Sequence, residues 1–551
     1  MQAIYAEKRR LVFLTVNCSY SHSSLALPLL HSACLDLTQW EWFRCDMTTS
    51  NDPIAAVAEI STYKCDLLVA DLYLFNRQTV LDVLQRYHTL DPACRIAVGG
   101  PECLGKGAED LLKEYPWLDR VFRGEGEMIF REYLENFDAP SQPPGRIVPE
   151  NGNAVYEQWS SSPYPVTDHF FVCDKPFVQI ETSRGCPMGC FYCTSGGTRT
   201  RYRSLEQVRE ELQLLCSKGI KEIRVLDRTF NLPQERGAAL LRMFREEFPQ
   251  MRFHLELHPQ FLNSVLREEL LKALPGQLHI EVGIQCLDPD VQDLSGRRSD
   301  VVAALAGLEF LCGQAQLVTH ADLLAALPGQ RWQHILADTA ALMKINTQEI
   351  QLEVLKALPG TPLREIAEKH GMRYNPSTPY DVMMSNTMTL EEVQRARVLS
   401  RLLDLTYNNS YLHEAVLTMS CESTEFVPRF LEFFHRIGGD CRTVWDLKKR
   451  FLFLLDFCRG YNLPKSRAVL AFKWLQAGYL PGQGPDKYTR KADKIPPEAK
   501  LCSGVPECVG ERESQYWALS VNGKNYYLVY NRKYALNRPA AIFSLQAKSA
   551  N

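Results

Sequence analysis

The stretch "RGCPMGCFYCTSGG" (184–197) places Cys186, Cys190 and Cys193 in a C-x3-C-x2-C spacing. An odd set of close cysteines does not suit a disulfide framework in a reducing compartment. A structural zinc site would need a fourth ligand, for which His169 is a candidate. A ferredoxin-type cluster would need a fourth cysteine. A further interpretation is a [4Fe–4S] cluster held at three irons, whose fourth iron stays open to bind a ligand.

The composition is that of a soluble multidomain protein. The chain has 551 residues, of which 45% are hydrophobic and 23% are charged, and its net charge is −3. The apolar run at residues 11–16 turns polar at Asn17, which does not fit an export signal. With 18 cysteines and no such signal, we expect reduced thiols and a cytoplasmic protein. No apolar run is long enough to predict a membrane span.

Residues 1–140 alternate predicted strands with predicted helices. The strands are almost continuously apolar, as in "LVFLTV" (11–16), which is typical of strands that are covered on both faces. This pattern predicts an α/β domain with an open, doubly wound parallel sheet. Ligands bind at the carboxyl ends of such strands, and two of these ends carry the glycine-containing segments "GGPE" (99–102) and "RGEGE" (123–127).

The rest of the chain divides into three predicted regions. Residues 141–175 are rich in proline, glycine and polar residues and predict a linker. Residues 176–375 hold six strand–helix units, which predict a barrel or partial barrel with the cysteines at its C-terminal rim. Residues 376–551 are predicted to be mainly helical, and Asn522-Gly523 near the end predicts a β-hairpin.

A basic segment raises the question of a nucleic-acid partner. Residues 442–500 hold 13 Lys and Arg against 5 Asp and Glu, with aromatic residues between them. Solvated helix faces are the favoured interpretation. A surface for an anionic substrate such as RNA is the alternative, and it is not favoured.

The cysteine pattern after the first strand of a barrel resembles that of the radical S-adenosylmethionine (SAM) superfamily. In that family the open iron binds SAM, and one electron from the cluster cleaves SAM to a 5′-deoxyadenosyl radical. The preceding domain, with "GGPE" and "RGEGE", resembles the cobalamin (B12)-binding domain of B12-dependent members. "NCSYSHSSLAL" (17–27) and "YNNSYL" (407–412) resemble a branch with a C-terminal domain of unknown function.

The resemblance implies a fold with three parts. A Rossmann-like cobalamin-binding domain would comprise residues 1–140, and a linker would follow at 141–175. A (βα)6 partial TIM barrel would form the radical SAM domain at 176–375. A mainly α C-terminal domain with a terminal β-hairpin would comprise residues 376–551.

The same resemblance implies the site residues. Cys186, Cys190 and Cys193 would bind the [4Fe–4S] cluster. The SAM-binding candidates are Tyr192, Asp227, Thr229, Glu281, Gln285 and Asp322. The cobalamin-binding candidates are Ser21, Ser23, Tyr73, Asn76, Gly99, Gly100, Glu102, Gly124 and Glu125. The family often has an acidic residue where Arg228 stands, which puts that contact in doubt. The D-x-H-x-x-G pattern is absent, so no histidine is expected below the cobalt, where Tyr73 or Phe75 would pack unless both are ordinary core residues.

We therefore expect a cobalamin-dependent radical SAM methyltransferase that acts on an unactivated carbon through a 5′-deoxyadenosyl radical and methylcobalamin. Its partners would be a small-molecule substrate and an electron donor such as flavodoxin or ferredoxin. One alternative is a B12-dependent radical SAM enzyme for cyclisation, rearrangement or oxidation. A second is a tRNA methylthiotransferase, which would hold another cluster on three N-terminal cysteines. A third is a non-enzymatic B12-binding or electron-transfer module.

Overall fold

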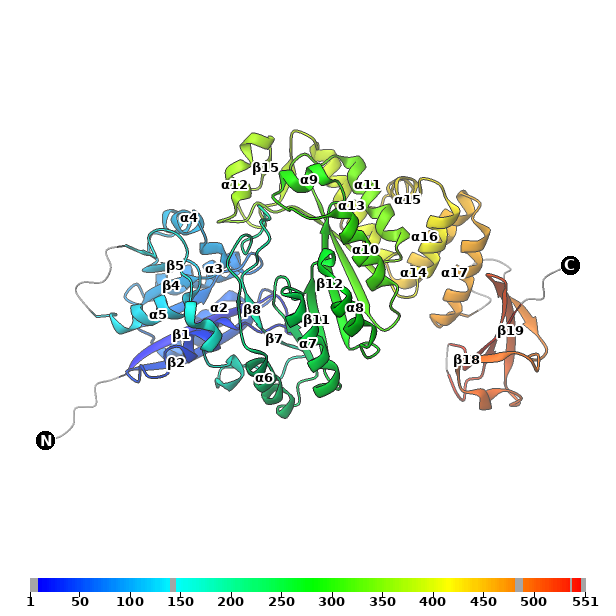
Figure 1. Ribbon diagram of the computed structural model, residues 1–551, viewed down its shortest axis with the longest axis horizontal. Coiled ribbons are helices and arrows are strands. Elements are labelled where there is room, and N and C mark those ends of the chain that lie inside the picture. The colour runs from blue at the N-terminus through cyan, green and yellow to red at the C-terminus, as the bar shows by residue number, and fades with distance from the viewer. Residues whose placement is uncertain (1–7, 139–144, 481–488, 536–537, 547–551) are drawn as a thin grey trace. The chain divides into compact units, whose positions relative to one another are not determined.

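The computed structural model describes residues 8–138, 145–480, 489–535 and 538–546 (Figure 1). The chain forms two compact units. The first lies within residues 1–319, 326–331 and 354–390, and the second within 320–325, 332–353 and 391–551. Among the residues that the structure describes, no helix has both the length and the apolar character that a bilayer crossing requires.

The first unit begins with a parallel sheet in the order β2-β1-β3-β4-β5-β6. Its strands are β1 (Arg9–Asn17), β2 (Trp40–Thr48), β3 (Leu67–Asp71), β4 (Arg95–Gly99), β5 (Arg120–Phe122) and β6 (Ile147–Val148). The central strands are apolar throughout because both faces of the sheet are covered: all five residues of β3 are buried. Strand β6 lies in the segment predicted as a linker.

Helices cover both faces of this sheet, as a doubly wound fold requires (Figure 1). The helices α2 (Pro53–Tyr63), α3 (Arg77–Leu90) and α4 (Gly107–Glu114) contribute to the apolar core on one face. On the other face, α1 (Ala26–Ser32) and α5 (Gly126–Glu135) form a second core with Phe13, Val69 and Phe122 of the sheet. The predicted Rossmann-like architecture is confirmed.

A second parallel sheet in the same unit carries the strands β7, β10, β11 and β12 in the order β12-β11-β10-β7. They span Val178–Ile180, Glu222–Val225, Arg252–Leu257 and Leu278–Gln285. The helices that follow these strands are α6 (Leu205–Ser217), α7 (Gln234–Glu247), α8 (Ser264–Leu271), α9 (Pro289–Leu294) and α10 (Val301–Cys312). Ser204 and Gln207 form the predicted capping box at the start of α6.

Residues 354–390 complete the first unit. They include α12 (Pro362–Ile366) and a two-stranded sheet of β15 (Arg373–Tyr374) and β16 (Val382–Met384). This segment meets the N-terminal sheet at two glycines: a Cβ added to Gly105 would lie 2.6 Å from the Cα of Gly360. The two backbones can approach so closely only because neither residue has a side chain.

The second unit holds strands at the fifth and sixth predicted positions, followed by helices and a terminal sheet. It contains most of β13 (Val318–Ala325), β14 (Glu349–Val354) and α13 (Leu390–Leu405). Its helices are α11 (Trp332–Lys344), α14 (His413–Glu422), α15 (Phe426–Arg436), α16 (Leu447–Gly460) and α17 (Pro464–Gln476). The helix α15 packs four phenylalanines inward, at 426, 430, 433 and 434.

The predicted hairpin is present and belongs to a larger sheet. Asn522 and Gly523 have φ values of 48° and 72°, as a two-residue primed turn between β19 (Gln515–Val521) and β20 (Lys524–Tyr530) requires. Three further strands extend the hairpin into an antiparallel sheet in the order β17-β19-β20-β21-β18. They are β17 (Arg490–Ala492), β18 (Lys500–Gly504) and β21 (Ala541–Gln546). Strand β18 is exposed along its whole length, which leaves no apolar alternation from which to predict it.

Candidate cofactor site

The three cysteines lie on a loop between two short strands. The loop leaves β8 (Ser183–Arg184) and returns through β9 (Arg201–Tyr202), which pairs antiparallel with β8. Its ends are tied together where the backbone N–H of Cys186 donates to the Thr198 hydroxyl at 3.0 Å and that of Thr198 donates to the Cys186 carbonyl at 2.9 Å. Cys186 and Cys190 are buried, and Cys193 is half-buried.

Two glycines make this loop compact. Gly185 has φ +96°, and a Cβ there would lie 2.4 Å from the carbonyl oxygen of Arg199. A Cβ on Gly196 would lie 2.6 Å from the carbonyl oxygen of Cys190. Neither position has room for a side chain, so the backbone folds tightly around the cysteines.

The sulfur atoms have hydrogen-bond donors beside them. The Thr229 hydroxyl lies 3.4 Å from Cys186 Sγ, the backbone N–H of Ser195 donates to Cys193 Sγ at 3.4 Å, and Arg297 Nη1 lies 3.7 Å from Cys190 Sγ. Burial raises the pKa of the Cys193 thiol. Donors around sulfur suit metal-bound thiolates. Three thiols with such donors on one compact loop fit an iron–sulfur cluster bound at three irons.

A cavity of about 720 Å³ opens beside the loop. We call it the central cavity. From the N-terminal sheet it is lined by residues at strand ends, among them Ser23, Asp71, Tyr73, Phe75, Gly99, Gly100, Gly124 and Glu125. From the cysteine loop and the neighbouring strands it is lined by Glu181, Arg184, Thr194, Ser195, Arg201 and Arg228. The carboxyl ends of the first sheet and the cysteine loop therefore share one cavity.

The central cavity extends into the apolar layer of the N-terminal domain. Its lining includes Phe13, Leu30, Val69, Phe122 and Phe130, which belong to or pack against the core between the sheet and the helices α1 and α5. Gly100 and Gly124 also line it: a Cβ on Gly100 would lie 2.7 Å from the Leu72 carbonyl oxygen, and one on Gly124 would lie 2.5 Å from the Ala154 nitrogen. The cavity thus combines an apolar recess with compact glycine turns, which suits a large ligand that has an apolar part.

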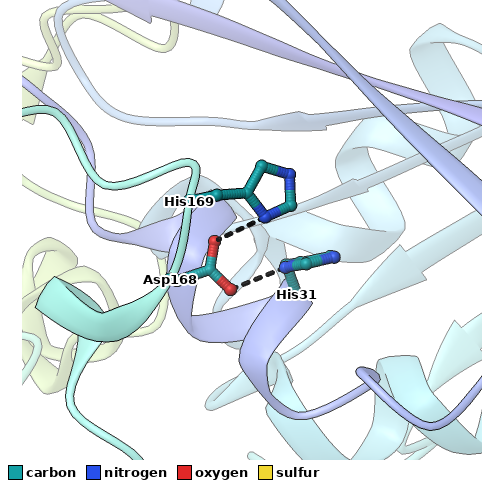
Figure 2. Close-up of side chains that lie close together, drawn as sticks. All are labelled: His31, Asp168 and His169. Atoms are coloured by element: carbon teal, nitrogen blue, oxygen red, sulfur yellow. Dashed lines mark hydrogen bonds and ion pairs between the residues drawn. The ribbon is translucent and has the colours of Figure 1, made fainter.

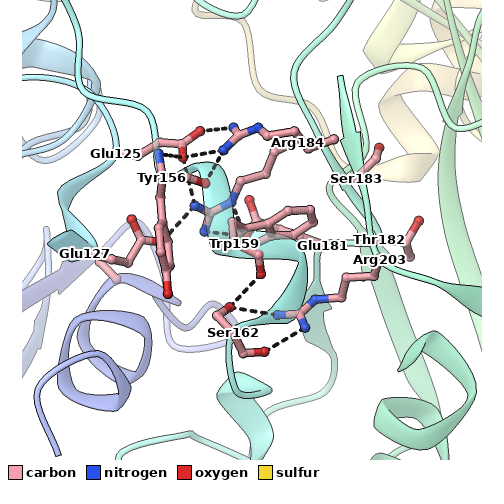
Figure 3. Close-up of polar contacts among 12 residues, drawn as sticks. Glu125, Glu127, Tyr156, Trp159, Ser162, Glu181, Thr182, Ser183, Arg184 and Arg203 are labelled. Atoms are coloured by element: carbon pink, nitrogen blue, oxygen red, sulfur yellow. Dashed lines mark hydrogen bonds and ion pairs between the residues drawn. The ribbon is translucent and has the colours of Figure 1, made fainter. Parts of the chain in front are cut away.

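A cluster of charged residues forms one wall of the cavity (Figure 3). The Arg184 guanidinium lies 2.7 Å from Glu127, 2.8 Å from Glu181 and 3.5 Å from Glu125. Arg201 also pairs with Glu125. Burial alone would raise the pKa of Glu125, but the two arginines hold it below its ordinary value. Because Glu125 and Glu127 follow β5 while Arg184 precedes Cys186 by two residues, this charged cluster ties the N-terminal domain to the cysteine loop.

Comparison with known proteins identifies the central part of the chain. Residues 180–340 match the family model of the radical SAM superfamily. Residues 180–340 belong to this superfamily. Residues 368–488 match a protein family of unknown function, DUF4080. The chain is therefore an enzyme with a radical SAM domain, followed by a domain of unknown function, as the cysteine motif and "YNNSYL" predict.

Three relatives place the match in context. An uncharacterized methyltransferase of Pyrococcus horikoshii is 26% identical over 58% of this chain and 73% of its own length. The cobalamin-dependent radical SAM methyltransferase TokK of Streptomyces tokunonensis is 22% identical over 57% of this chain and 50% of its own length. The solved structure of the cobalamin-dependent SAM radical enzyme OxsB, with aqua-cobalamin and SAM bound, aligns with a TM-score of 0.57, at 14% identity, over 85% of this chain and 79% of that one. At 14% identity, the similarity to OxsB shows a shared fold.

Six of the nine cobalamin-binding candidates line the central cavity: Ser23, Tyr73, Gly99, Gly100, Gly124 and Glu125. The other three have internal partners. Ser21 is hydrogen-bonded to Ser19 at 2.9 Å. Asn76 accepts from the Tyr73 N–H at 2.7 Å and donates to the Val16 carbonyl at 3.1 Å. It shapes the loop after β3.

Glu102, the third of these candidates, contacts the last segment of the first unit, residues 354–390. The Tyr380 hydroxyl donates to its carboxylate at 2.5 Å, and Arg77 lies 3.5 Å away. Burial raises the pKa of Glu102, although Tyr380 and Arg77 oppose that shift. Glu102 therefore fastens the "GGPE" turn to the segment that ends the first unit.

None of the SAM-binding candidates of the first unit is among the residues that line the central cavity. Asp227 accepts from the backbone N–H groups of Thr182 and Ser183 at 2.8 and 2.9 Å, so it fixes the end of β7. Thr229 lies beside Cys186. Burial raises the pKa of Tyr192, which lies within electrostatic reach of Arg297.

The candidates on β12 and β13 have neighbours on their own or an adjacent strand. Glu281 lies 2.9 Å from His254 Nε2 on β11. Gln285 has φ +69°, and its amide nitrogen lies 2.6 Å from where a Cβ on Gly283 would be. In the second unit, Asp322 lies 2.9 Å from His320 Nε2.

A histidine–aspartate cluster fastens the linker to α1 (Figure 2). Asp168 accepts from His31 Nδ1 at 2.6 Å, from the Ser32 hydroxyl at 3.1 Å and from the Phe170 N–H at 2.9 Å. Burial would raise the pKa of Asp168, but these hydrogen bonds hold it below its ordinary value. His169 Nδ1 lies 4.0 Å from the same carboxylate. The contacts of His169 are thus with this cluster, which gives no support to the zinc interpretation of the cysteine motif.

Sequence reasoning missed the charged wall and the apolar recess. Arg184 stands inside the quoted motif, but its closest carboxylate partner, Glu127, is 57 positions earlier in the sequence. Phe13 and Phe122 are indistinguishable in sequence from other core residues. The only signal for the charged wall was the "RGEGE" segment.

Loss of Arg184 should weaken the first unit. The side chains of Arg184 and Glu127 are 9% and 6% exposed, so Arg184→Gln leaves a buried carboxylate without its closest cation. We expect the free energy of local opening of this segment to fall by about 3 kcal/mol, measured by amide hydrogen exchange. The matched control is Arg252→Gln, which removes an exposed pair with Glu222 at 2.9 Å. This control should change stability by less than about 1 kcal/mol. Equal effects of the two variants would contradict the structural role of Arg184.

Asp71 should make stability depend on pH in the cofactor-free protein. Burial raises its pKa to about 6, although the Ser24 hydroxyl donates to it at 2.7 Å. A raised carboxyl pKa stabilises the fold below the unfolded pKa, and this contribution is lost as the pH rises to about 6. Between pH 4.5 and 7.5 the wild type should therefore lose about 2 kcal/mol relative to Asp71→Asn. Denaturant unfolding at both pH values measures this difference, and Ser24→Ala should enlarge it. Parallel pH profiles for wild type and Asp71→Asn would contradict it.

Proposed function

We propose that this enzyme is a cobalamin-dependent radical SAM methyltransferase that acts on an unactivated carbon. One observation carries the proposal: the cysteine loop and the carboxyl ends of the Rossmann-like sheet line the same cavity. When bound, the cluster with SAM would supply radical chemistry and cobalamin would supply methyl transfer. The methyltransferase names of two relatives support the same reaction class.

The residues of the chain would bind and orient these groups. Cys186, Cys190 and Cys193 would hold three irons, and the glycines around them keep the loop compact. Gly100 and Gly124 would keep the turns at the cobalamin side of the sheet compact, because a Cβ at either position would meet backbone atoms of the chain itself. The apolar recess would take the least polar part of that cofactor.

Tyr73 and Phe75 are the candidates to face the corrin. Their rings stack at 5.6 Å with an interplanar angle of 13°, and both line the central cavity. Burial raises the pKa of Tyr73, so the phenol remains neutral at physiological pH. A neutral aromatic pair would offer a flat surface without a strong ligand for cobalt.

The charged wall would separate the reacting groups from water. Arg184 and Arg201 are each less than 10% exposed, and their carboxylate partners belong to the same wall. Water exclusion limits side reactions of reactive species.

The distribution of N-terminal cysteines argues against a methylthiotransferase. Cys34 belongs to the core on one face of the Rossmann-like sheet. Cys45, Cys65, Cys94 and Cys103 belong to the core on the opposite face. A second cluster on three cysteines would have to draw on the latter group, all of which are buried. As further parts of the proposal, we place the enzyme in the cytoplasm and expect a flavodoxin or ferredoxin as electron donor.

Metal analysis tests the cluster. After anaerobic reconstitution with iron and sulfide, the wild type should hold about four irons per chain. Cys193→Ala should lose most of the iron and of the cluster absorbance. Cys216→Ala removes a cysteine of similar exposure whose Sγ accepts from Gln250 at 3.0 Å, and it should keep the cluster. Full iron content in Cys193→Ala, or about eight irons in the wild type, would contradict a single cluster on this loop.

Product analysis tests the reaction. The reconstituted enzyme, given cobalamin, SAM and a reductant, should form 5′-deoxyadenosine, and S-adenosylhomocysteine should accumulate as methyl groups are transferred. 5′-Deoxyadenosine without S-adenosylhomocysteine would favour cyclisation, rearrangement or oxidation. Neither product under any condition would overturn the proposal.

A further inference from the structure

Arg228 occupies a central place in the cavity. It follows β10 and lines the cavity wall. Its guanidinium lies within electrostatic reach of the Cys193 thiol and of Tyr73, which belongs to the Rossmann-like domain. A ligand that touches both the cysteine loop and the strand ends of the first sheet would therefore pass close to Arg228.

Apart from Arg199, which is 80% exposed and lies 3.5 Å from Glu157, the other arginines of the cavity are committed to carboxylates. Arg184 has three carboxylate neighbours within 3.5 Å. Arg201 is bound to Glu125 through two nitrogens and donates to the Tyr156 carbonyl at 2.5 Å. Both side chains are less than 10% exposed, so neither can turn toward a ligand without breaking buried ion pairs.

Arg228 differs in both respects. Its closest described ion-pair contact is with Glu256, at 3.5 Å from Nη1, which is longer than a hydrogen bond between charged groups. Half of the Arg228 side chain, 51%, is exposed. A guanidinium has five N–H donors in a planar fork. Most of that fork remains available to a ligand in the cavity.

We propose that Arg228 binds a carboxylate inside the central cavity. A planar guanidinium matches a carboxylate in two parallel hydrogen bonds, and such pairs are strong where water is partly excluded. The proposal rests on the function proposed above. The carboxylate has two possible sources, the methyl acceptor and SAM, and the experiment separates them. If the acceptor is the source, its chemical class is an organic acid.

The first arm of the experiment compares SAM with decarboxylated SAM, which lacks only the carboxylate. Equilibrium dialysis with the cluster- and cobalamin-loaded protein gives dissociation constants for wild type, Arg228→Gln, Arg228→Lys and the surface control Arg252→Gln. If SAM is the source, Arg228→Gln should weaken SAM about tenfold and leave decarboxylated SAM unchanged. Arg228→Lys should restore part of the SAM affinity because it keeps the charge but not the fork.

The second arm uses benzoate and its neutral isostere benzamide as probes of the acceptor space. Saturation-transfer NMR on the SAM-bound protein measures both affinities. If the acceptor is the source, the wild type should bind benzoate more tightly than benzamide by about tenfold, and Arg228→Gln should abolish that preference. Arg252→Gln should behave as the wild type in both arms.

The two binding measurements together identify the source of the carboxylate or reject the proposal. A change confined to the first arm assigns the carboxylate to SAM, and one confined to the second assigns it to the acceptor. If Arg228→Gln changes neither SAM affinity nor the benzoate preference, the proposal is wrong. Both arms measure binding, so they remain informative if no methyl transfer is found, and failure of the proposed function is therefore distinguishable from failure of this inference.

Discussion

The buried contact between Arg184 and Glu127 is the constraint on which the candidate site depends. It joins the residue two positions before Cys186 to the start of α5, and both side chains are almost fully buried. Taking two charges out of water is costly, and the cost is recovered only when the partners stay together. Here Glu125, Glu181 and Arg201 surround the pair and supply further charge-assisted contacts. The position of the cysteine loop against the Rossmann-like sheet is therefore specified by electrostatics, in addition to apolar packing.

Two further contacts also hold segments of the first unit against the N-terminal domain. Tyr380 reaches Glu102 beside the "GGPE" turn, where the backbones of Gly105 and Gly360 also meet. Asp168 fastens the linker to α1 through His31. Each contact uses a polar residue of the N-terminal domain to bind a segment distant in sequence. The carboxyl edge of the sheet thus has two kinds of polar residue. Some bind other segments of the first unit, and the others line the cavity.

This division explains what the sequence could predict. The alternation of elements, the doubly wound sheet, the hairpin turn and the cysteine loop rest on local patterns, and each is present in the structure. Like Gly100 and Tyr73, Glu102 and Asn76 follow strands of the first sheet. The local sequence pattern therefore predicts that all four residues bind the ligand. What separates them is a partner: Glu102 meets Tyr380, which is 278 positions away. The apolar recess was missed for a related reason, because Phe13 faces a cavity only where α1 and α5 leave room.

The arginines of the cavity show most clearly that local sequence cannot separate structural residues from ligand-binding ones. They also show how the structure separates them. Arg184 ends β8 and Arg228 follows β10, and both line one cavity and carry the same charge. Arg184 is surrounded by three carboxylates and is buried, so its donors are consumed and its removal should cost stability. Arg228 has its closest ion-pair contact at 3.5 Å, with Glu256, and is half exposed, so donors remain for a ligand and its removal should cost affinity for that ligand. The number of partners and the burial, rather than residue type or position on a strand, decide whether a charge in such a cavity supports the fold or binds a ligand.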